Sequence, residues 1–267
     1  MAARINILPS TPPESPTEKP RDPADLLKAK SHFVFDLDAD TLHDGRAARS
    51  RAAFAVHQKI SILYGIPTDA LAAAHETLLR SSKRATTAAD GAADRAQQQQ
   101  SDEQRTKQRF AALLARFGKP ASAHLLDGYL TVYRARLERA LQPRAGAEAL
   151  LARLRAQGKS VVVVTAGPRE AGEWTVEKLG LSGFVGSVVA KGGFGEGAHG
   201  DLLARLGVDA GEVVYVAGGG GGEEGVVVAA KRAGMMAVLC TEERDDSYGE
   251  DGCYRICSLE QLADMMR

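Results

Sequence analysis

Two aspartates, Asp36 and Asp38, come directly after the apolar run Phe33–Phe35. Aromatic and β-branched residues that end abruptly in acids are typical of a buried β-strand and the turn after it. Residues two apart in such a turn can both face a cleft. Two carboxylates there can hold Mg2+ through oxygen ligands, or one can attack a phosphorus or carbon centre while the other moves a proton. Aspartate is also common in ordinary turns, but the D-x-D spacing after a strand favours the functional interpretation.

A second apolar run, Val161–Val164, ends at Thr165, Ala166 and Gly167. The residues that follow have a helical pattern, so this segment lies where a strand passes into a helix. A hydroxyl together with exposed backbone N–H groups at a helix start suits an anionic oxygen. The alternative is a threonine that only caps the helix or stabilises a turn. The segment is therefore a candidate substrate-binding element.

Two further runs end in residues that bear on the same chemistry. FVGSVVA is followed by Lys191, which can neutralise a phosphoryl group, although a single lysine before a glycine-rich loop is more often only solvated. EVVYVAG is followed by GGGGEEG, in which Glu223 and Glu224 are the only acids. These glycines lack the Lys-Ser or Lys-Thr of a phosphate-binding P-loop. A dinucleotide site using Glu242 or Glu243 is an open alternative, but its strand-helix unit comes late in the chain.

The order of the elements brings these strand ends together. From about residue 144 onward, helical and strand-like runs alternate, and runs of consecutive valines are typical of parallel sheets covered on both faces. We therefore predict an α/β fold, a doubly wound, Rossmann-like parallel sheet formed by residues 31–42 and 144–267. Ligands bind such sheets at the carboxyl ends of the strands.

The remaining segments have different patterns. Helical spacing over residues 43–143 predicts an inserted α-helical cap domain. Within it, residues 81–108 are polar and low in complexity, which indicates a flexible loop or a solvated helix. Residues 1–30 contain six prolines and are expected to be a disordered leader.

Charge and composition exclude several classes of partner. Lys+Arg and Asp+Glu both number 34, so the net charge of zero argues against nucleic acid and anionic membranes as partners. No apolar run approaches the roughly 20 residues needed to cross a bilayer, and no secretory signal is evident. The three cysteines, all near the end of the chain, indicate reduced thiols and a cytoplasmic location. The expected partner is a small-molecule substrate, and the oligomeric state stays open.

From Phe33 to the C-terminus, the sequence resembles the haloacid dehalogenase (HAD) superfamily of hydrolases. FDLDADTL resembles its first motif, VVVVTAG its second and EVVYVAGGGGGEEGVVVAAKRAGM its fourth. The helical insert is similar to the cap module of one branch of this superfamily, which closes over small substrates. The resemblance implies a Mg2+-dependent hydrolase with Asp36 as nucleophile and Asp38 as general acid/base. It also implies that Thr165 and Lys191, as the third-motif residue, hold phosphoryl oxygens.

Two of the motifs leave alternatives open. The family usually has D-x-D-G-T-L, whereas this first motif has one extra residue. A register with Asp38 as nucleophile and Asp40 as acid is therefore also open, but Asp36 follows the apolar strand directly and is preferred. For the third motif, His199 is an alternative to Lys191 because it lies in a segment where the basic residue could also be expected.

The fourth motif departs most from the family. It normally supplies one or two aspartates to the metal, but counting back from Ala233 and Gly234 places a glycine and Val226 there. Glu223 and Glu224 are the candidate metal ligands beside the first-motif pair, provided that the loop is shifted. Mg2+ bound by the first-motif carboxylates alone would be held more weakly, and catalysis would fall with it.

Two functional hypotheses follow. The first is a Mg2+-dependent phosphatase of a small phosphorylated metabolite, acting through an aspartyl-phosphate. The second is a catalytically weakened HAD-like relative with a binding or regulatory role. A metal-independent dehalogenase of haloacids fits less well, because such enzymes resemble the first motif without its second aspartate. Polar residues of the cap that could line a substrate pocket, although each is more typical of a helix surface, are His57, His75, Arg109, His124, Tyr129, Tyr133 and Arg134.

Overall fold

The computed structural model describes residues 22–88, 102–190, 197–218, 224–241 and 253–267. Its centre is a six-stranded sheet with the order β3-β2-β1-β4-β5-β6, and every neighbouring pair is parallel. The predicted α/β fold with a doubly wound parallel sheet is confirmed. The strands are β1 (His32–Asp36), β2 (Ser160–Thr165), β3 (Ser187–Ala190), β4 (Val213–Gly218), β5 (Met236–Cys240) and β6 (Tyr254–Ile256).

Helices cover both faces of the sheet, which is why its strands are apolar throughout. Phe33 and Phe35 of β1 pack with one set of helices, α7 (Ala147–Ala156), α8 (Arg169–Lys178) and α11 (Leu259–Met265). Val34 faces the opposite side, where α9 (Ala198–Leu206) and α10 (Glu224–Arg232) lie. A short 3-10 helix, η1 (Ala210–Glu212), leads into β4. Alternate residues of a strand face opposite sides, so both sides must be apolar.

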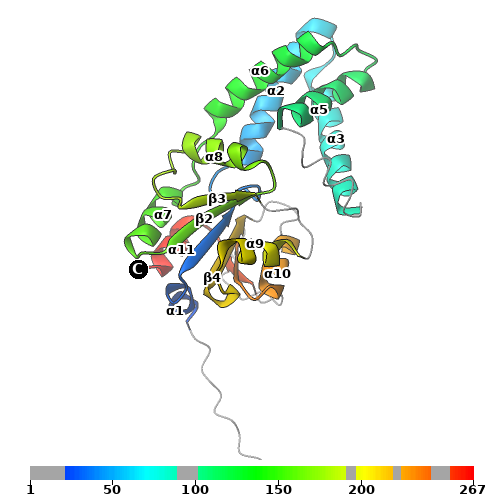
Figure 1. Cartoon of the computed structure of the whole chain (residues 1–267). Helices are drawn as coiled ribbons and strands as arrows, with labels where there is room; N and C mark the ends of the chain where they lie inside the picture. The colour runs from blue at the N-terminus through cyan, green and yellow to red at the C-terminus, as the bar shows by residue number, and fades with distance from the viewer. Residues whose placement is uncertain (1–21, 89–101, 191–196, 219–223, 242–252) are drawn as a thin grey trace, which may run out of the picture.

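Four helices form a separate layer beyond one end of the sheet (Figure 1). These cap helices are α2 (Gly45–Tyr64), α3 (Thr68–Ala88), α5 (Asp102–Arg116) and α6 (Ala123–Ala140). Their shared core contains Val56, Ile60, Leu71, Phe110 and Leu113, which are all buried. The two chain segments that connect the cap to the sheet lie together, because His43 and Pro143 form an antiparallel bridge.

The predicted end of the leader was wrong. Within the expected leader, Pro23–Lys28 forms helix α1: Asp22 caps it, proline is tolerated in its first turn, and Leu27 is fully buried. Residues 1–21 lie outside the described residues. The segment at 81–108, expected to be a flexible loop or a solvated helix, is helical at both ends, since α3 runs to Ala88 and α5 begins at Asp102. Thr106 and Phe110 of α5 are one turn apart and both buried, so a helix is favoured despite the polar composition.

No helix in the described part of the chain is long and apolar enough to cross a membrane.

Candidate active site

Asp36 lies at the carboxyl end of β1, and its side chain is almost completely buried. Its Oδ1 accepts a hydrogen bond from the backbone N–H of Asp38 at 3.2 Å. Its Oδ2 accepts one from the Tyr215 hydroxyl at 2.6 Å. Tyr215 comes from the neighbouring strand β4, where it pairs with Val34 and so faces the same side of the sheet as Asp36. The carboxylate is thus oriented by two donors from two segments of the chain.

Tyr215 remains a donor because its proton is held firmly. Burial raises the pKa of its hydroxyl well above the usual value, and the nearby Asp36 carboxylate raises this pKa further. The ring of His199, from α9, packs edge-on against Tyr215, with 4.9 Å between the ring centroids. His199 therefore lies behind Tyr215. Sequence reasoning missed Tyr215 because it stands inside an apolar strand; the one signal was a phenol among valines, since a buried hydroxyl needs a partner.

Asp38 is exposed and turns toward the carboxyl end of β2. Its Oδ2 accepts a hydrogen bond from the backbone N–H of Ala166, and the Thr165 hydroxyl lies 3.5 Å from its Oδ1. The Thr165 oxygen in turn accepts from the N–H of Gly167 at 3.1 Å. The end of β2 was predicted to bind an anionic oxygen. In the structure its donors face the carboxylate oxygens of Asp38.

The loop after β1 is held in a fixed shape. The buried Thr41 hydroxyl donates to the backbone carbonyl of Asp36 at 2.7 Å, which closes the loop. Asp40 has a φ of 52° and turns its carboxylate to helix α2, where it accepts from Arg49 at 3.2 Å and from the N–H of Arg46 at 3.2 Å. The structure thus brings Asp36 and Asp38 to the end of β2, and directs Asp40 to the cap.

The end of β4 approaches the same loop very closely. A Cβ atom on Gly218 would lie 2.1 Å from the carbonyl oxygen of Ala39 and 3.2 Å from that of Asp40. Real Cβ atoms essentially never come this close to other atoms, so no side chain fits at this position as the loop stands. The last residue of β4 therefore cannot contribute a carboxylate.

The other predicted residues at this edge are only partly described. Lys191 and Glu223 lie outside the described residues, and Glu224 is the first residue of α10. Nowhere in the described ranges do three or more His, Cys, Asp or Glu residues come together as a metal-binding group. The described part of the site thus offers two carboxylates, Asp36 and Asp38, as hard oxygen ligands.

The cap contributes a basic residue that sequence reasoning missed. Arg105 of α5 reaches the end of β2, where its Nη2 lies 3.8 Å from the position that a Cβ on Gly167 would occupy. Arg109 follows one turn later and is half-buried. Arg105 was overlooked because it stands in the low-complexity segment. A charged residue spaced four before the predicted Arg109 was the available signal.

The remaining polar residues predicted for the cap have mixed positions. Tyr133 is buried against Phe110, and Arg134 pairs with Glu103. His124 and Tyr129 border a separate hollow between α2 and α6. His57 and His75 are buried inside the cap, where His57 Nε2 and His75 Nδ1 lie 2.9 Å apart.

The buried histidine pair predicts that the protein loses stability in mild acid. The pKa of both His57 and His75 is lowered from 6.5 to about 4, chiefly by burial and, for His75, also by the neighbouring His57 and Arg109. Below the unfolded pKa the unfolded chain binds protons that the folded cap excludes. Stability present above about pH 6.5 is therefore lost as the pH falls toward 4, by about 2 kcal/mol for each histidine at pH 5. Thermal unfolding at several pH values measures this.

His75→Gln is expected to reduce this acid sensitivity, because it removes one of the two excluded protonation sites of the pair. Burial also lowers the pKa of His43 to about 4, so part of the acid sensitivity remains. The exposed His124 provides the matched control, since His124→Gln removes a histidine of the same cap without changing its core. Equal pH dependence in the wild type and in His75→Gln would show that the pair does not control stability.

Comparisons with known proteins show the family and the fold of the chain. The family model described as haloacid dehalogenase-like hydrolase matches residues 30–220. None of the curated proteins compared with the chain matches it. Among solved structures, the HAD-hydrolase YfnB from Bacillus subtilis, bound to magnesium, is similar, with a TM-score of 0.65 and 20% identity over 89% of this chain and 98% of that one.

Two other structures represent different chemistries on the same fold. L-2-haloacid dehalogenase from Xanthobacter autotrophicus has a TM-score of 0.60 and 17% identity, covering 89% of this chain and 98% of that one. The HAD phosphatase from Thermococcus onnurineus has a TM-score of 0.57 and 21% identity, with 88% and 97% covered. At such identities the likeness concerns the fold. The family model spans most of the chain, however, and the chain belongs to the haloacid dehalogenase-like hydrolases.

Proposed function

We propose that the chain is a phosphatase of a small phosphorylated metabolite that acts through an aspartyl-phosphate on Asp36. One observation carries this proposal: a buried, oriented carboxylate and an exposed one lie at the end of β1, and the exposed one rests on the anion-binding donors of β2. A nucleophile, a proton-transfer group and a place for anionic oxygens are thereby grouped at one strand edge, which is what stepwise phosphoryl transfer needs.

In the proposed reaction, an oxygen of the Asp36 carboxylate attacks phosphorus and forms an aspartyl-phosphate as the ester O–P bond breaks. Protonated Asp38 gives its proton to the departing alkoxide. Asp38, now a carboxylate, then takes a proton from the water that attacks phosphorus. This step releases inorganic phosphate and restores both side chains. The Thr165 hydroxyl and the N–H of Ala166 would hold phosphoryl oxygens, so Asp38 must turn away from these donors when substrate binds.

The two carboxylates fit a Mg2+ ion, because Mg2+ commonly takes one or two carboxylates and completes its coordination with water and substrate phosphate. Asp36 and Asp38 would hold the ion, which supplies charge neutralisation for the phosphoryl group when bound. Since the described residues bring no third acid to this edge, we expect weak binding that depends on bound substrate.

A second candidate function is a catalytically weakened relative with a binding or regulatory role. The observation that favours it is the end of β4, where the carbonyl of Ala39 leaves no room for a side chain on Gly218. Such a protein would keep the anion-binding donors of the site but turn over phosphate esters very slowly.

Acid quenching of the full chain during turnover of phenyl phosphate with Mg2+ separates these functions. We expect phosphate release and a phosphoryl adduct on the peptide that contains Asp36 when the quenched protein is analysed by mass spectrometry. Fragmentation that places the adduct on Asp38 would overturn the choice of nucleophile. Neither phosphate release nor an adduct would favour the weakened relative.

Tyr215→Phe is expected to lower kcat about tenfold and leave KM nearly unchanged, because a hydrogen bond to a charged group contributes roughly 1.5–3 kcal/mol and this one orients the nucleophile. The variant removes only the hydroxyl that lies 2.6 Å from Asp36. Steady-state kinetics on phenyl phosphate measures the change. Tyr64→Phe in the cap is the control, and a rise in KM with unchanged kcat would contradict an orienting role.

A further inference from the structure

We propose that Arg109, together with Arg105 and Arg49, forms a second anion-binding subsite that faces the acid pair, so that the preferred substrate is a phosphate monoester with a further carboxylate or phosphate group. The proposal rests on the proposed function for the position of the reacting phosphate. It goes further by naming the chemical class of the substrate.

The first step is the position of the arginines near the loop after β1 and the end of β2. Arg105 approaches the end of β2, where its Nη2 comes near Gly167. Arg49 of α2 holds the carboxylate of Asp40, in the loop that follows β1, at 3.2 Å. Arg109 lies one turn beyond Arg105 on the same side of α5, and both Arg105 and Arg49 act on it electrostatically. Three cationic side chains from two cap helices thus border the segments that carry the acid pair.

The second step is charge balance. Arg105 pairs with Asp102, and Arg49 pairs with Asp40. Arg109 has neither an ion pair nor a side-chain hydrogen bond with any residue in the described parts of the chain. It is half-buried, and burial lowers its pKa, whereas Tyr133 and Asp102 raise it. Such a guanidinium has lost part of its hydration and keeps its N–H donors available to an anion. An anion from a ligand would supply the missing acceptor.

The third step is the chemistry of that anion. A guanidinium presents planar, paired N–H groups that match the two oxygens of a carboxylate or a phosphate. The phosphate that reacts at Asp36 would occupy the donors of Thr165 and Ala166, so it is not also available to Arg109. The buried Tyr133 lies close enough for Arg109 to act on its hydroxyl, and it adds a neutral donor beside the cation. The subsite therefore fits a second anionic group on the same substrate.

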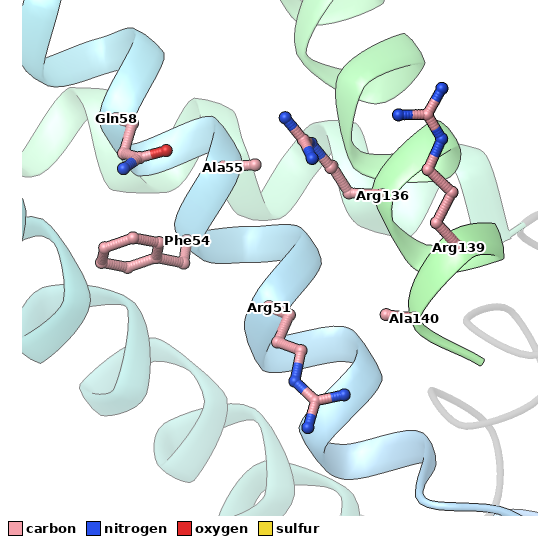
Figure 2. A pocket seen from close by; sticks show the side chains of 7 residues that line it. All are labelled: Arg51, Phe54, Ala55, Gln58, Arg136, Arg139 and Ala140. Carbon is pink, nitrogen blue, oxygen red and sulfur yellow. The ribbon is translucent and has the colours of Figure 1, made fainter. Parts of the chain in front are cut away.

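Arginines on the outer side of the cap do not meet these conditions. Arg51, Arg136 and Arg139 line a hollow between α2 and α6, together with Phe54. Figure 2 shows that Arg51 extends away from Arg136 and Arg139, so the three guanidinium groups do not converge on one point. Arg136 is therefore a matched control: it has the same side chain, lies in the same cap, and lines this hollow, which contains none of the three subsite arginines.

The test is isothermal titration of the full chain carrying Asp36→Asn, which prevents turnover, in the presence of Mg2+. Glycerol phosphate and phosphoglycerate, both esterified at the terminal hydroxyl, differ only in the neutral or carboxylate group at the other end. We expect phosphoglycerate to bind about tenfold tighter or more, given the strength of a paired guanidinium–carboxylate contact. In the Asp36→Asn background, Arg109→Gln should remove the preference for phosphoglycerate and leave the affinity for glycerol phosphate unchanged. Arg136→Gln in the same background should leave that preference intact.

Two further measurements complete the test. Glycerol bisphosphate has a second phosphate in place of the carboxylate of phosphoglycerate. If only glycerol bisphosphate binds more tightly than glycerol phosphate, and this gain in affinity depends on Arg109, the second group of the substrate is a phosphate. Arg109→Lys keeps the charge and should retain part of the preference, which separates loss of the subsite from a folding defect in Arg109→Gln. Equal affinity for all three ligands, or a preference that survives Arg109→Gln, would overturn the subsite.

Failure of the subsite and failure of the proposed function give different results. Wild-type hydrolysis of glycerol phosphate, without any preference that depends on Arg109, would remove the subsite and keep the phosphatase. No hydrolysis, with a preference that depends on Arg109, would keep the subsite as part of a binding protein.

Discussion

Asp36→Asn is expected to lower kcat for phenyl phosphate by at least about a thousandfold, because an amide cannot serve as the attacking nucleophile. The fold should survive the change. Asn Oδ1 can still accept from the N–H of Asp38, and its Nδ2 can donate to the Tyr215 oxygen, since a phenol both donates and accepts. The buried position therefore keeps both of its hydrogen bonds while it loses its charge.

Phosphate release measures the effect, and thermal unfolding of the same preparation shows whether the fold is kept. Asp40→Asn is the matched control. Its carboxylate binds Arg46 and Arg49 of the cap, and asparagine tolerates the φ of 52° at this position. We expect Asp40→Asn to change kcat less than about tenfold, as for loss of an exposed ion pair. A large loss in Asp40→Asn with little change in Asp36→Asn would support the shifted register instead.

The sheet was predictable from sequence because its signals are local and strong. A run such as Val161–Val164 is apolar at every position, which only a strand covered on both faces requires, and parallel order follows from alternation with helices. The acid pair was visible for the same reason, since charge directly after such a run marks the strand end. Helix α1 was missed because its N-terminal signal, Asp22 followed by Pro23, stands among prolines that break helices elsewhere.

The contacts of the site were not predictable in the same way. The hydrogen bond between Tyr215 and Asp36 joins residues 179 positions apart. It depends on the strand order β1-β4, which the sequence does not state. Arg105 reaches Gly167 only because α5 belongs to the helical layer beyond one end of the sheet. Such contacts follow from the packing of elements, whereas residue patterns report only the local period and the ends of each element.

The glycine run that begins at the last residue of β4 illustrates this limit, and it leads to the largest stability effect that we expect from a single substitution. Five consecutive glycines suggest only backbone freedom. At Gly218 the structure shows a different requirement, because the backbone of the loop after β1 fills the space of a side chain. Gly218→Ala should therefore destabilise the protein by about 1–3 kcal/mol or more through overpacking, and a shift of the acid pair should lower kcat with it.

Gly128→Ala is the matched control, because this glycine lies within helix α6 and a Cβ there meets no atom within 4 Å. Alanine is the better helix former by about 0.5–1 kcal/mol, so this variant should be slightly more stable than the wild type. Thermal unfolding of both variants measures these effects. If Gly218→Ala unfolds at the wild-type temperature, the loop after β1 can move aside at little cost in stability. The close approach of Ala39 would then not explain why the end of β4 has no side chain.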